Sequence, residues 1–330
     1  MLLDNIKQSW DKVNKRIDDF IKGEEKESFR LLFVTDVHIG GPNGYHIEQL
    51  RALKRLLPGS KIDFVVNGGD IGLDVGEDEK EAKRVISLTK EATDYGDIPY
   101  FFCKGNHDNK PNLLGRKGLS PYLNRFFLSK VDPKKGRIVL SDENEGGYGY
   151  YIDTKSDTKF IFLNTSENVR GFNVSKEQLR FVVNELMNAS EKKIVIISHY
   201  CLNECGAWNR YPEVLNERMQ ALRRIEKDFA SREKGEFDGL LWDFRNVSPQ
   251  LVFHLSGDSH FNSESRSDGY LIASRQGYGG VDKEDLPLGA SVDDFDKHEE
   301  CDFDILVLTK NHAKLFRVGA GENEKDIDIL

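Results

Sequence analysis

The stretch Tyr100-Phe101-Phe102-Cys103-Lys104-Gly105-Asn106-His107-Asp108 joins an apolar run to a group of polar side chains. The apolar residues predict a buried strand, and Gly-Asn-His-Asp follows where that strand ends. Open α/β sheets bind their ligands at the carboxyl edge of their strands. The stretch therefore indicates a functional site at a sheet edge, with side chains that are able to bind a metal ion.

Four other apolar runs end in the same kinds of residue. The runs at 32–34, 64–66, 195–197 and 253–255 are followed by Asp36 and His38, by Asn67 and Asp70, by His199, and by Asp258 and His260. A single Asp or His after a strand is usually a helix cap or a satisfied strand end, but five such endings are hard to explain in that way. Carboxylate, imidazole and amide oxygen together suit a divalent ion such as Mn, Fe, Zn or Mg.

Strands and helices alternate around the first three of these runs. Arg30–Thr35, Ile62–Val66 and Ile98–Cys103 are apolar enough for strands that are covered on both faces. Amphipathic helices are predicted between them, near residues 47–57 and 82–92. The order β-α-β-α-β predicts a parallel sheet with right-handed crossovers.

The remaining chain predicts a second group of strands with further helices. Residues 147–153 and 159–164 alternate as the strands of a hairpin do, and the helix 175–187 starts with Ser175 and Gln178 in the positions of a capping box. Helices are also expected at 121–128 and 212–230, and strands at 194–197, 251–255, 270–274, 304–308 and 313–318.

Residues 2–22 place apolar side chains at three- and four-residue steps, which predicts an amphipathic helix. Its polar face mixes Asp with Lys, so docking on the domain is favoured over binding to a membrane surface. We expect this helix and a linker at 1–28, a main domain at 29–320 and a tail at 321–330. The segments 113–135 and 276–300 are predicted to be insertions or loops near the site.

Composition narrows the classes of function. The 330 residues carry a net charge of −9, which argues against a broad surface for duplex nucleic acid. Four cysteines do not suggest a disulfide framework here, and a metal or disulfide role for Cys201 and Cys205 is not favoured. The charged N-terminus does not resemble a signal peptide, and no apolar run is long enough to span a membrane. We therefore expect a cytoplasmic protein.

The order Asp-x-His, Gly-Asp, Gly-Asn-His-Asp, a lone His and Gly-x-x-His resembles the calcineurin-like metallophosphoesterase superfamily. The five motifs run from Asp36 to His260, about two thirds of the chain. The resemblance implies an α/β fold, a four-layer α-β-β-α sandwich of two mixed sheets, here with an added N-terminal helix. It also implies an enzyme with two divalent metal ions, which hydrolyses phosphate mono- or diesters by attack of a metal-bridging hydroxide.

The resemblance assigns roles to nine residues of this sequence. Seven would be metal ligands: Asp36, His38 and His260 at the first metal, Asn106, His199 and Asp258 at the second, and Asp70 bridging both. His107 would act as a general acid or hold the phosphoryl oxygens, and Asp108 would fix the orientation of His107.

The chain departs from the family at residue 258. The family has Gly-His-x-His where this chain has Gly257-Asp258-Ser259-His260. As a ligand, Asp258 would add a third carboxylate to those of Asp36 and Asp70 and would offset more of the metals' positive charge. We hypothesise a second site that prefers Mn or Mg to Zn, with Mn favoured overall, and a preference for diesters over dianionic monoesters. Alternatively, Asp258 contacts no metal and the second ion binds weakly.

Five further side chains could contact a substrate: Arg170, Arg275, Trp208, Tyr211 and His46. Arginines could bind the phosphate oxygens, and the aromatic rings could stack on a nucleobase. Surface ion pairs, core packing and a helix start explain the same residues more simply. His254, His298 and His312 are assigned no role.

The sequence thus predicts a two-metal phosphoesterase that prefers a phosphodiester, with a small phosphoester or nucleotide-like substrate. A phosphomonoesterase and a nuclease of the same superfamily are the enzymatic alternatives, although the acidic charge counts against binding of duplex nucleic acid. A non-catalytic metal-binding scaffold is the alternative from a different class. The presence of His107 and Asp108 argues against a scaffold, which has no need of an acid.

Overall fold

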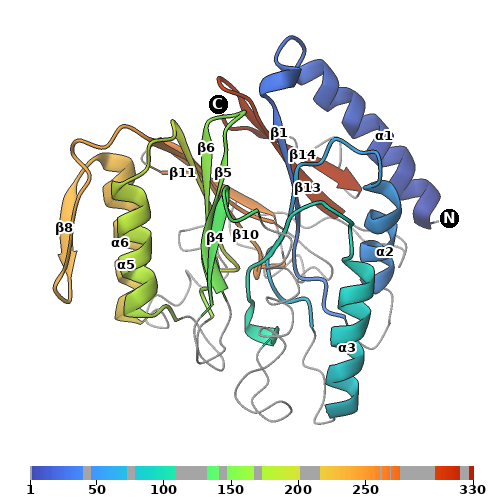
Figure 1. The fold of residues 1–330 in the computed structure, drawn as a ribbon, viewed down its shortest axis with the longest axis horizontal. Coiled ribbons are helices and arrows are strands. Elements are labelled where there is room, and N and C mark those ends of the chain that lie inside the picture. The colour runs from blue at the N-terminus through green and yellow to red at the C-terminus, as the bar shows by residue number, and fades with distance from the viewer. Residues whose placement is uncertain are drawn as a thin grey trace.

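Two mixed β-sheets lie at the centre of the molecule, and helices cover their outer faces (Figure 1). The computed structural model describes residues 2–39, 46–72, 79–108, 132–140, 147–166, 173–200, 216–260, 262–267, 269–275, 302–319 and 327–330. The helix expected at 121–128, the loop 276–300, most of the segment 113–135, and Cys201 and Cys205 lie outside these residues. The predicted four-layer α-β-β-α sandwich is confirmed.

The first sheet carries the β-α-β-α-β unit that the sequence predicts. Its strand order is β15-β14-β13-β1-β2-β3, in which β1, β2 and β3 are parallel and β13 is antiparallel to β1. The strands are β1 (Phe29–Val34), β2 (Phe64–Asn67), β3 (Tyr100–Phe102), β13 (Asp302–Leu308), β14 (Ala313–Gly319) and β15 (Ile327–Asp328), and the crossover helices are α2 (His46–Leu56) and α3 (Glu79–Ala92). The carboxyl ends of β1, β2 and β3 therefore lie along one edge.

The second sheet has the order β11-β12-β10-β7-β6-β5-β4, with a parallel centre formed by β6, β7, β10 and β12. Its strands are β4 (Gly136–Leu140), β5 (Gly147–Asp153), β6 (Thr158–Phe162), β7 (Lys193–Ile197), β10 (Gln250–Ser256), β11 (Ser263–Ser267) and β12 (Tyr270–Ser274). The helices α5 (Lys176–Met187) and α6 (Glu217–Ser231) cover its outer face, and β8 (Lys234–Phe237) and β9 (Leu240–Asp243) form a separate hairpin beside α6 (Figure 1).

The two sheets meet in an apolar layer that is rich in aromatic rings. Phe101 of β3 stacks on Phe162 of β6 with their ring centroids 4.2 Å apart, and Phe29 of β1 packs against Phe160 at 5.1 Å. Every residue of β1, β2, β3, β6 and β7 is buried. Strands covered on both faces read as continuous apolar runs, which is why the sequence indicates these strands well.

The N-terminal helix α1 (Leu2–Phe20) docks on the first sheet as predicted. Its apolar face buries Trp10, Val13 and Ile17, and the Trp10 ring lies 6.0 Å from that of Phe303 on β13. Figure 1 shows α1, α2 and α3 on the side of the molecule opposite to α5 and α6. None of the helices in the described ranges is long and apolar enough to cross a membrane.

The first half of the predicted capping box of α5 is confirmed. Ser175 Oγ accepts a hydrogen bond from the Gln178 backbone N–H at 3.1 Å, as an N-cap should. The Gln178 side chain turns the other way, accepting from Asn164 N and donating to Asn164 O, both at 2.8 Å. Gln178 is buried, and its amide satisfies the backbone of the chain that leaves β6.

Candidate metal centre

Five strand ends, from β1, β2 and β3 of one sheet and β7 and β10 of the other, bring the predicted ligands together. Among the described residues they form two overlapping groups, within each of which the candidate ligand atoms lie within 4.8 Å of one another. The first group is Asp36, His38, Asp70 and His260, and the second is Asp70, His199 and Asp258. Asp70 belongs to both groups, which is where a bridging ligand has to lie.

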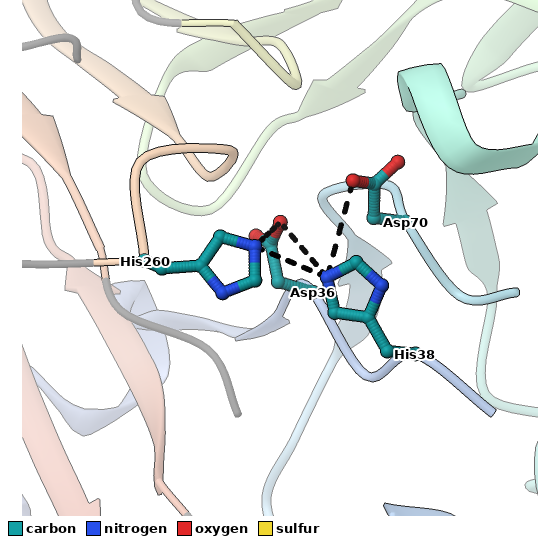
Figure 2. A group of neighbouring side chains, drawn as sticks. All are labelled: Asp36, His38, Asp70 and His260. Carbon is teal, nitrogen blue, oxygen red and sulfur yellow. Dashed lines mark hydrogen bonds and ion pairs between the residues drawn. The ribbon is translucent and has the colours of Figure 1, made fainter. Parts of the chain in front are cut away.

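The first group converges on a small space between four side chains (Figure 2). The Nε2 atoms of His38 and His260 lie 3.1 Å apart, and His260 Nε2 lies 3.5 Å from Asp36 Oδ1. Asp36 Oδ1 is buried and has no hydrogen-bond partner. Because a buried carboxylate oxygen without a partner costs free energy, this oxygen and the facing nitrogens fit a divalent cation.

The second group is built around His199, which is completely buried. Its Nδ1 lies 2.8 Å from the Gly68 carbonyl oxygen and donates to it, so that Nε2 keeps its lone pair when the ring is neutral. Nε2 lies 3.0 Å from Asn106 Oδ1 and 3.5 Å from one carboxylate oxygen each of Asp70 and Asp258. The residues predicted for the second metal, including Asp258, therefore surround one point.

Five of the candidate ligands have a left-handed backbone. Among the described non-glycine residues with positive φ are Asp36, His38, Asp70, Asp258 and His260, with φ of 52°, 50°, 51°, 67° and 53°. Such residues are uncommon and cost free energy, and they gather at functional sites. The sharp turns that they form let the chain leave each strand while its side chain points into the centre.

Glycines allow the close approach of these turns. Gly69 has φ of 108°, and a Cβ there would lie 2.5 Å from His199 Nδ1. A Cβ on Gly257 would lie 2.0 Å from Thr35 Oγ1 and 2.4 Å from Asp36 Oδ2. The sequence pattern did not single out Thr35, yet its hydroxyl donates to Asp36 Oδ2 at 2.5 Å and orients that carboxylate. Its only sequence signal is a polar side chain at the end of an apolar run.

Asp108 accepts hydrogen bonds from the backbone around Asp70, and its role in orienting His107 stays a prediction. Its Oδ2 accepts hydrogen bonds from the backbone N–H groups of Asp70 and Gly105, and its Oδ1 accepts from those of Ile71 and Gly72, at 2.8–3.1 Å. Both oxygens thus accept from backbone N–H groups, three of which belong to the loop that carries Asp70. His107 is instead positioned by its backbone N–H, which donates to Asp70 Oδ1 at 2.9 Å.

Burial and neighbouring charges shift the pKa values of the candidate ligands in different directions. Burial lowers the pKa of His38 to about 3, although Asp70 opposes this shift, so the ring is neutral at pH 7. Burial also lowers the pKa of His199, but Asp70 and Asp258 outweigh it and hold that pKa well above its usual value. Burial raises the pKa of Asp70, and the nearby His199 and His38 more than reverse that effect and lower it. The carboxylates of Asp70 and Asp258 thus favour positive charge beside His199, which a bound cation would also supply.

Burial and the neighbouring Asp70 raise the pKa of Asp108 to about 7, against the effect of the N–H groups of Gly105 and Gly72. Burial likewise raises the pKa of Asp36, while His260 and His199 oppose the shift. Burial thus makes the ionised form of Asp36 costly, and a cation bound at this carboxylate would stabilise it.

The structure places only part of the predicted substrate-binding set. The Arg275 guanidinium is fully buried and binds Asp304 at 3.1 Å and Glu264 at 2.6 Å, so it is not available to a substrate. His46 is the first residue of α2, and its side chain is outside the described part of the chain. Arg170, Trp208 and Tyr211 also lie outside the described residues.

Comparisons with known proteins agree with this geometry. The family model of calcineurin-like phosphoesterases matches residues 29–261. A dimetal phosphatase from Danio rerio has a similar structure, with a TM-score of 0.57 and 13% identity over 91% of this chain and 98% of that one. A purple acid phosphatase from yellow lupin (Lupinus luteus) has a TM-score of 0.56 and 11% identity over 92% of this chain and 53% of that one.

GAP50, the anchor in the inner membrane complex of Plasmodium, is also similar, with a TM-score of 0.51 and 12% identity over 92% of this chain and 88% of that one. No curated protein sequence matches the chain. At such identities the solved structures show the fold alone. The family model, in contrast, covers more than half of the chain and includes every strand end of the metal centre.

Proposed function

Because the chain belongs to the calcineurin-like phosphoesterase family, whose members are phosphoric ester hydrolases, we propose that it hydrolyses a small phosphodiester at the centre around Asp70. The observation that carries this proposal is the place of Asp258. Its Oδ1 lies 3.5 Å from His199 Nε2, within the second group of candidate ligands. The family's pattern has an imidazole at this position, and this chain has a carboxylate.

The donor set suits two divalent ions. Asp36, His38 and His260 would hold the first, Asn106, His199 and Asp258 the second, and Asp70 both. Bound cations would polarise the phosphoryl oxygens and acidify a water molecule. The carboxylates of Asp70 and Asp258 and the amide oxygen of Asn106 are hard ligands, so manganese or magnesium is favoured over zinc at the second site, and manganese is our first choice.

His107 is placed to deliver a proton to the leaving group. Its side chain is 34% exposed, whereas the candidate ligands around it are largely buried, so it can reach both substrate and solvent. Its Nε2 lies 4.0 Å from Asp70 Oδ2, at the border of the proposed metal centre. We assign the general acid to this atom.

The preference for diesters follows from charge. A monoester enters as a dianion and a diester as a monoanion, so an extra carboxylate at the centre repels the monoester more strongly. With Asp258, the ligands carry three negative charges (Asp36, Asp70 and Asp258) against the charges of two divalent ions. A site closer to neutral selects against the dianion, which supports a diester substrate.

Replacing Asp258 tests this proposal. With manganese-loaded protein, Asp258→His should lower the ratio of kcat/KM for bis(p-nitrophenyl) phosphate over p-nitrophenyl phosphate by about tenfold, because one negative charge is removed. Asp258→Asn is the matched control: it removes the charge without adding an imidazole, and should move the ratio in the same direction. An unchanged ratio in both variants would contradict the proposal.

A metal-binding scaffold is the alternative that one comparison favours, since GAP50 is an anchor and has a similar fold. The exposed His107 beside Asp70 supports the enzyme instead. A nucleotide-like diester remains within the proposed substrate class, and a cytoplasmic location remains a prediction from the sequence.

A further inference from the structure

Three buried side chains outside the metal centre form a chain of hydrogen bonds that ends next to His199. Glu226 of α6 lies with its two carboxylate oxygens 2.9 and 3.0 Å from Nδ1 of His254 on β10. His254 Nε2 lies 2.8 Å from Oγ of Ser198, the residue between β7 and His199. All three side chains are at most 2% exposed.

The hydroxyl of Ser198 indicates which atoms carry the protons in the hydrogen bonds between Glu226, His254 and Ser198. Ser198 Oγ also lies 2.6 Å from the Tyr200 carbonyl oxygen, which can only accept a hydrogen bond. The hydroxyl has a single proton, and this proton forms the hydrogen bond to the Tyr200 carbonyl oxygen. His254 Nε2 must therefore donate to Ser198 Oγ, and with Glu226 present as a carboxylate, Nδ1 donates to it. An imidazole that donates from both nitrogens is an imidazolium, so His254 and Glu226 form a buried ion pair.

The hydrogen bond from Ser198 to Tyr200 closes a tight turn around His199. The same turn is held by Ser198 N donating to Leu255 O, by Gly257 N donating to His199 O, and by Tyr200 N donating to Thr165 Oγ1, at 2.9–3.1 Å. Of these bonds, only the one from the Ser198 hydroxyl depends on a proton that could point elsewhere. Because the imidazolium of His254 donates to Ser198 Oγ, the hydroxyl proton cannot point toward His254 and is directed to Tyr200 O.

We propose that Glu226 and His254 are positioning residues for the second metal site. Their ion pair directs the Ser198 proton onto Tyr200 O, and the braced turn holds His199 Nε2 toward Asn106, Asp70 and Asp258. This inference rests on the proposed function for the metal that His199 would bind. The arrangement resembles a Ser-His-Glu catalytic triad in its order, but a fully buried serine whose proton is held by a carbonyl is not a nucleophile.

Nitrogen-detected NMR of histidine-labelled protein tests the protonation state directly and does not depend on metal. Both ring nitrogens of His254 should be protonated at pH 7, in wild-type protein with and without Mg²⁺. In Glu226→Gln no carboxylate balances the charge of an imidazolium, so the ring should be neutral. Nε2 should keep its proton for Ser198 Oγ, and Nδ1 should lose its proton and accept from the amide N–H. An unprotonated Nε2 in the wild type at pH 7 would overturn the inference.

Metal binding tests the positioning role. Calorimetric titration of metal-stripped Glu226→Gln with Mn²⁺ should show second-site affinity reduced about 3- to 10-fold, because groups behind a ligand typically tune affinity by such factors or more. First-site affinity should be unchanged. Asp228→Asn is the matched control, since Asp228 lies on the same helix and is also buried, but accepts from Trp242 Nε1 at 2.9 Å.

Asp228→Asn should lower stability without changing either affinity. If Glu226→Gln lowers stability yet keeps both affinities within about twofold of the wild type, the pair is only structural and the inference is wrong. If the wild-type protein binds no second ion, the proposed function fails instead, and the protonation of His254 is still decided by NMR.

Discussion

Asp108, next to the catalytic candidate His107, supports the backbone around the metal centre. It accepts four backbone hydrogen bonds from Gly105 and from residues 70–72. Asp108→Ala leaves four buried N–H groups without partners, and should lower the free energy of unfolding by about 2–5 kcal/mol, as measured by urea denaturation of metal-stripped protein.

His107→Ala is the companion variant for this prediction. It should leave the urea midpoint almost unchanged, because His107 is partly exposed, and should lower kcat by about 100-fold or more, because it removes the acid. If Asp108→Ala instead kept full stability and matched His107→Ala in kcat, Asp108 would act through His107 after all.

At this scale the sequence predicts which residues gather, but not how they are held. The strand-end pattern identifies Asp36, Asp70 and His199 because polar residues that follow apolar runs are visible in one dimension. The positive φ of Asp36 and Asp70, and the use of Gly68 O and Thr35 Oγ1 as partners, arise only when two sheets face each other. No local pattern encodes them.

At the scale of elements, α1 is joined to the first strand by a polar contact as well as by apolar packing. The Arg30 side chain on β1 is 3% exposed, and its guanidinium donates to Asp18 Oδ1 at 2.7 Å and to Asn14 Oδ1 at 3.4 Å. A buried guanidinium needs its acceptors, so α1 completes the domain instead of merely covering it.

Removing the Asp18 carboxylate should weaken the docking of α1 on β1. Asp18→Asn should lower the free energy of unfolding by about 1–2 kcal/mol at pH 7, a modest value because Asp18 is half-exposed. Asp19→Asn, at an exposed position of the same helix, should have almost no effect.

The effect of Asp18 should depend on pH. Burial alone would raise the pKa of Asp18, but Arg30 and Lys61 reverse this and lower it. A carboxyl with a lowered pKa in the folded state stabilises the protein above its ordinary pKa, and that contribution is lost as pH falls through the lowered value. The difference between wild type and Asp18→Asn should therefore shrink as pH falls below the ordinary pKa of an aspartate and disappear once pH is below the lowered pKa, and a difference that grew on acidification would contradict the assignment.

Helices and strands with a clear hydrophobic periodicity are predicted well from the sequence. Elements that are defined by pairing or packing with distant parts of the chain are not. The helices α1, α2, α3, α5 and α6 and the buried strands lie within a few residues of their predicted positions, apart from the start of α6. The hairpin of β8 and β9 was missed because its residues alternate weakly and pack on α6, and β11 was missed because Ser263–Ser267 is polar. The residues of β15, assigned to a tail, pair with β14.

At the scale of the whole molecule, the metal centre exists because two sheets present their carboxyl edges to each other. The first sheet supplies Asp36, His38, Asp70 and Asn106, and the second supplies His199, Asp258 and His260. Neither sheet holds a full ligand set. Activity should therefore depend on the packing between the sheets as much as on the ligands themselves.

The most direct test of a two-metal phosphoesterase is to return Mn²⁺ to metal-stripped protein and follow hydrolysis of bis(p-nitrophenyl) phosphate. We expect two ions bound per chain and turnover that requires them, with Asp70→Asn lowering kcat by about 100-fold or more because both sites lose a ligand. Absence of turnover with Mn, Fe, Zn and Mg, while two ions are bound, would contradict the account and indicate a metal-binding scaffold.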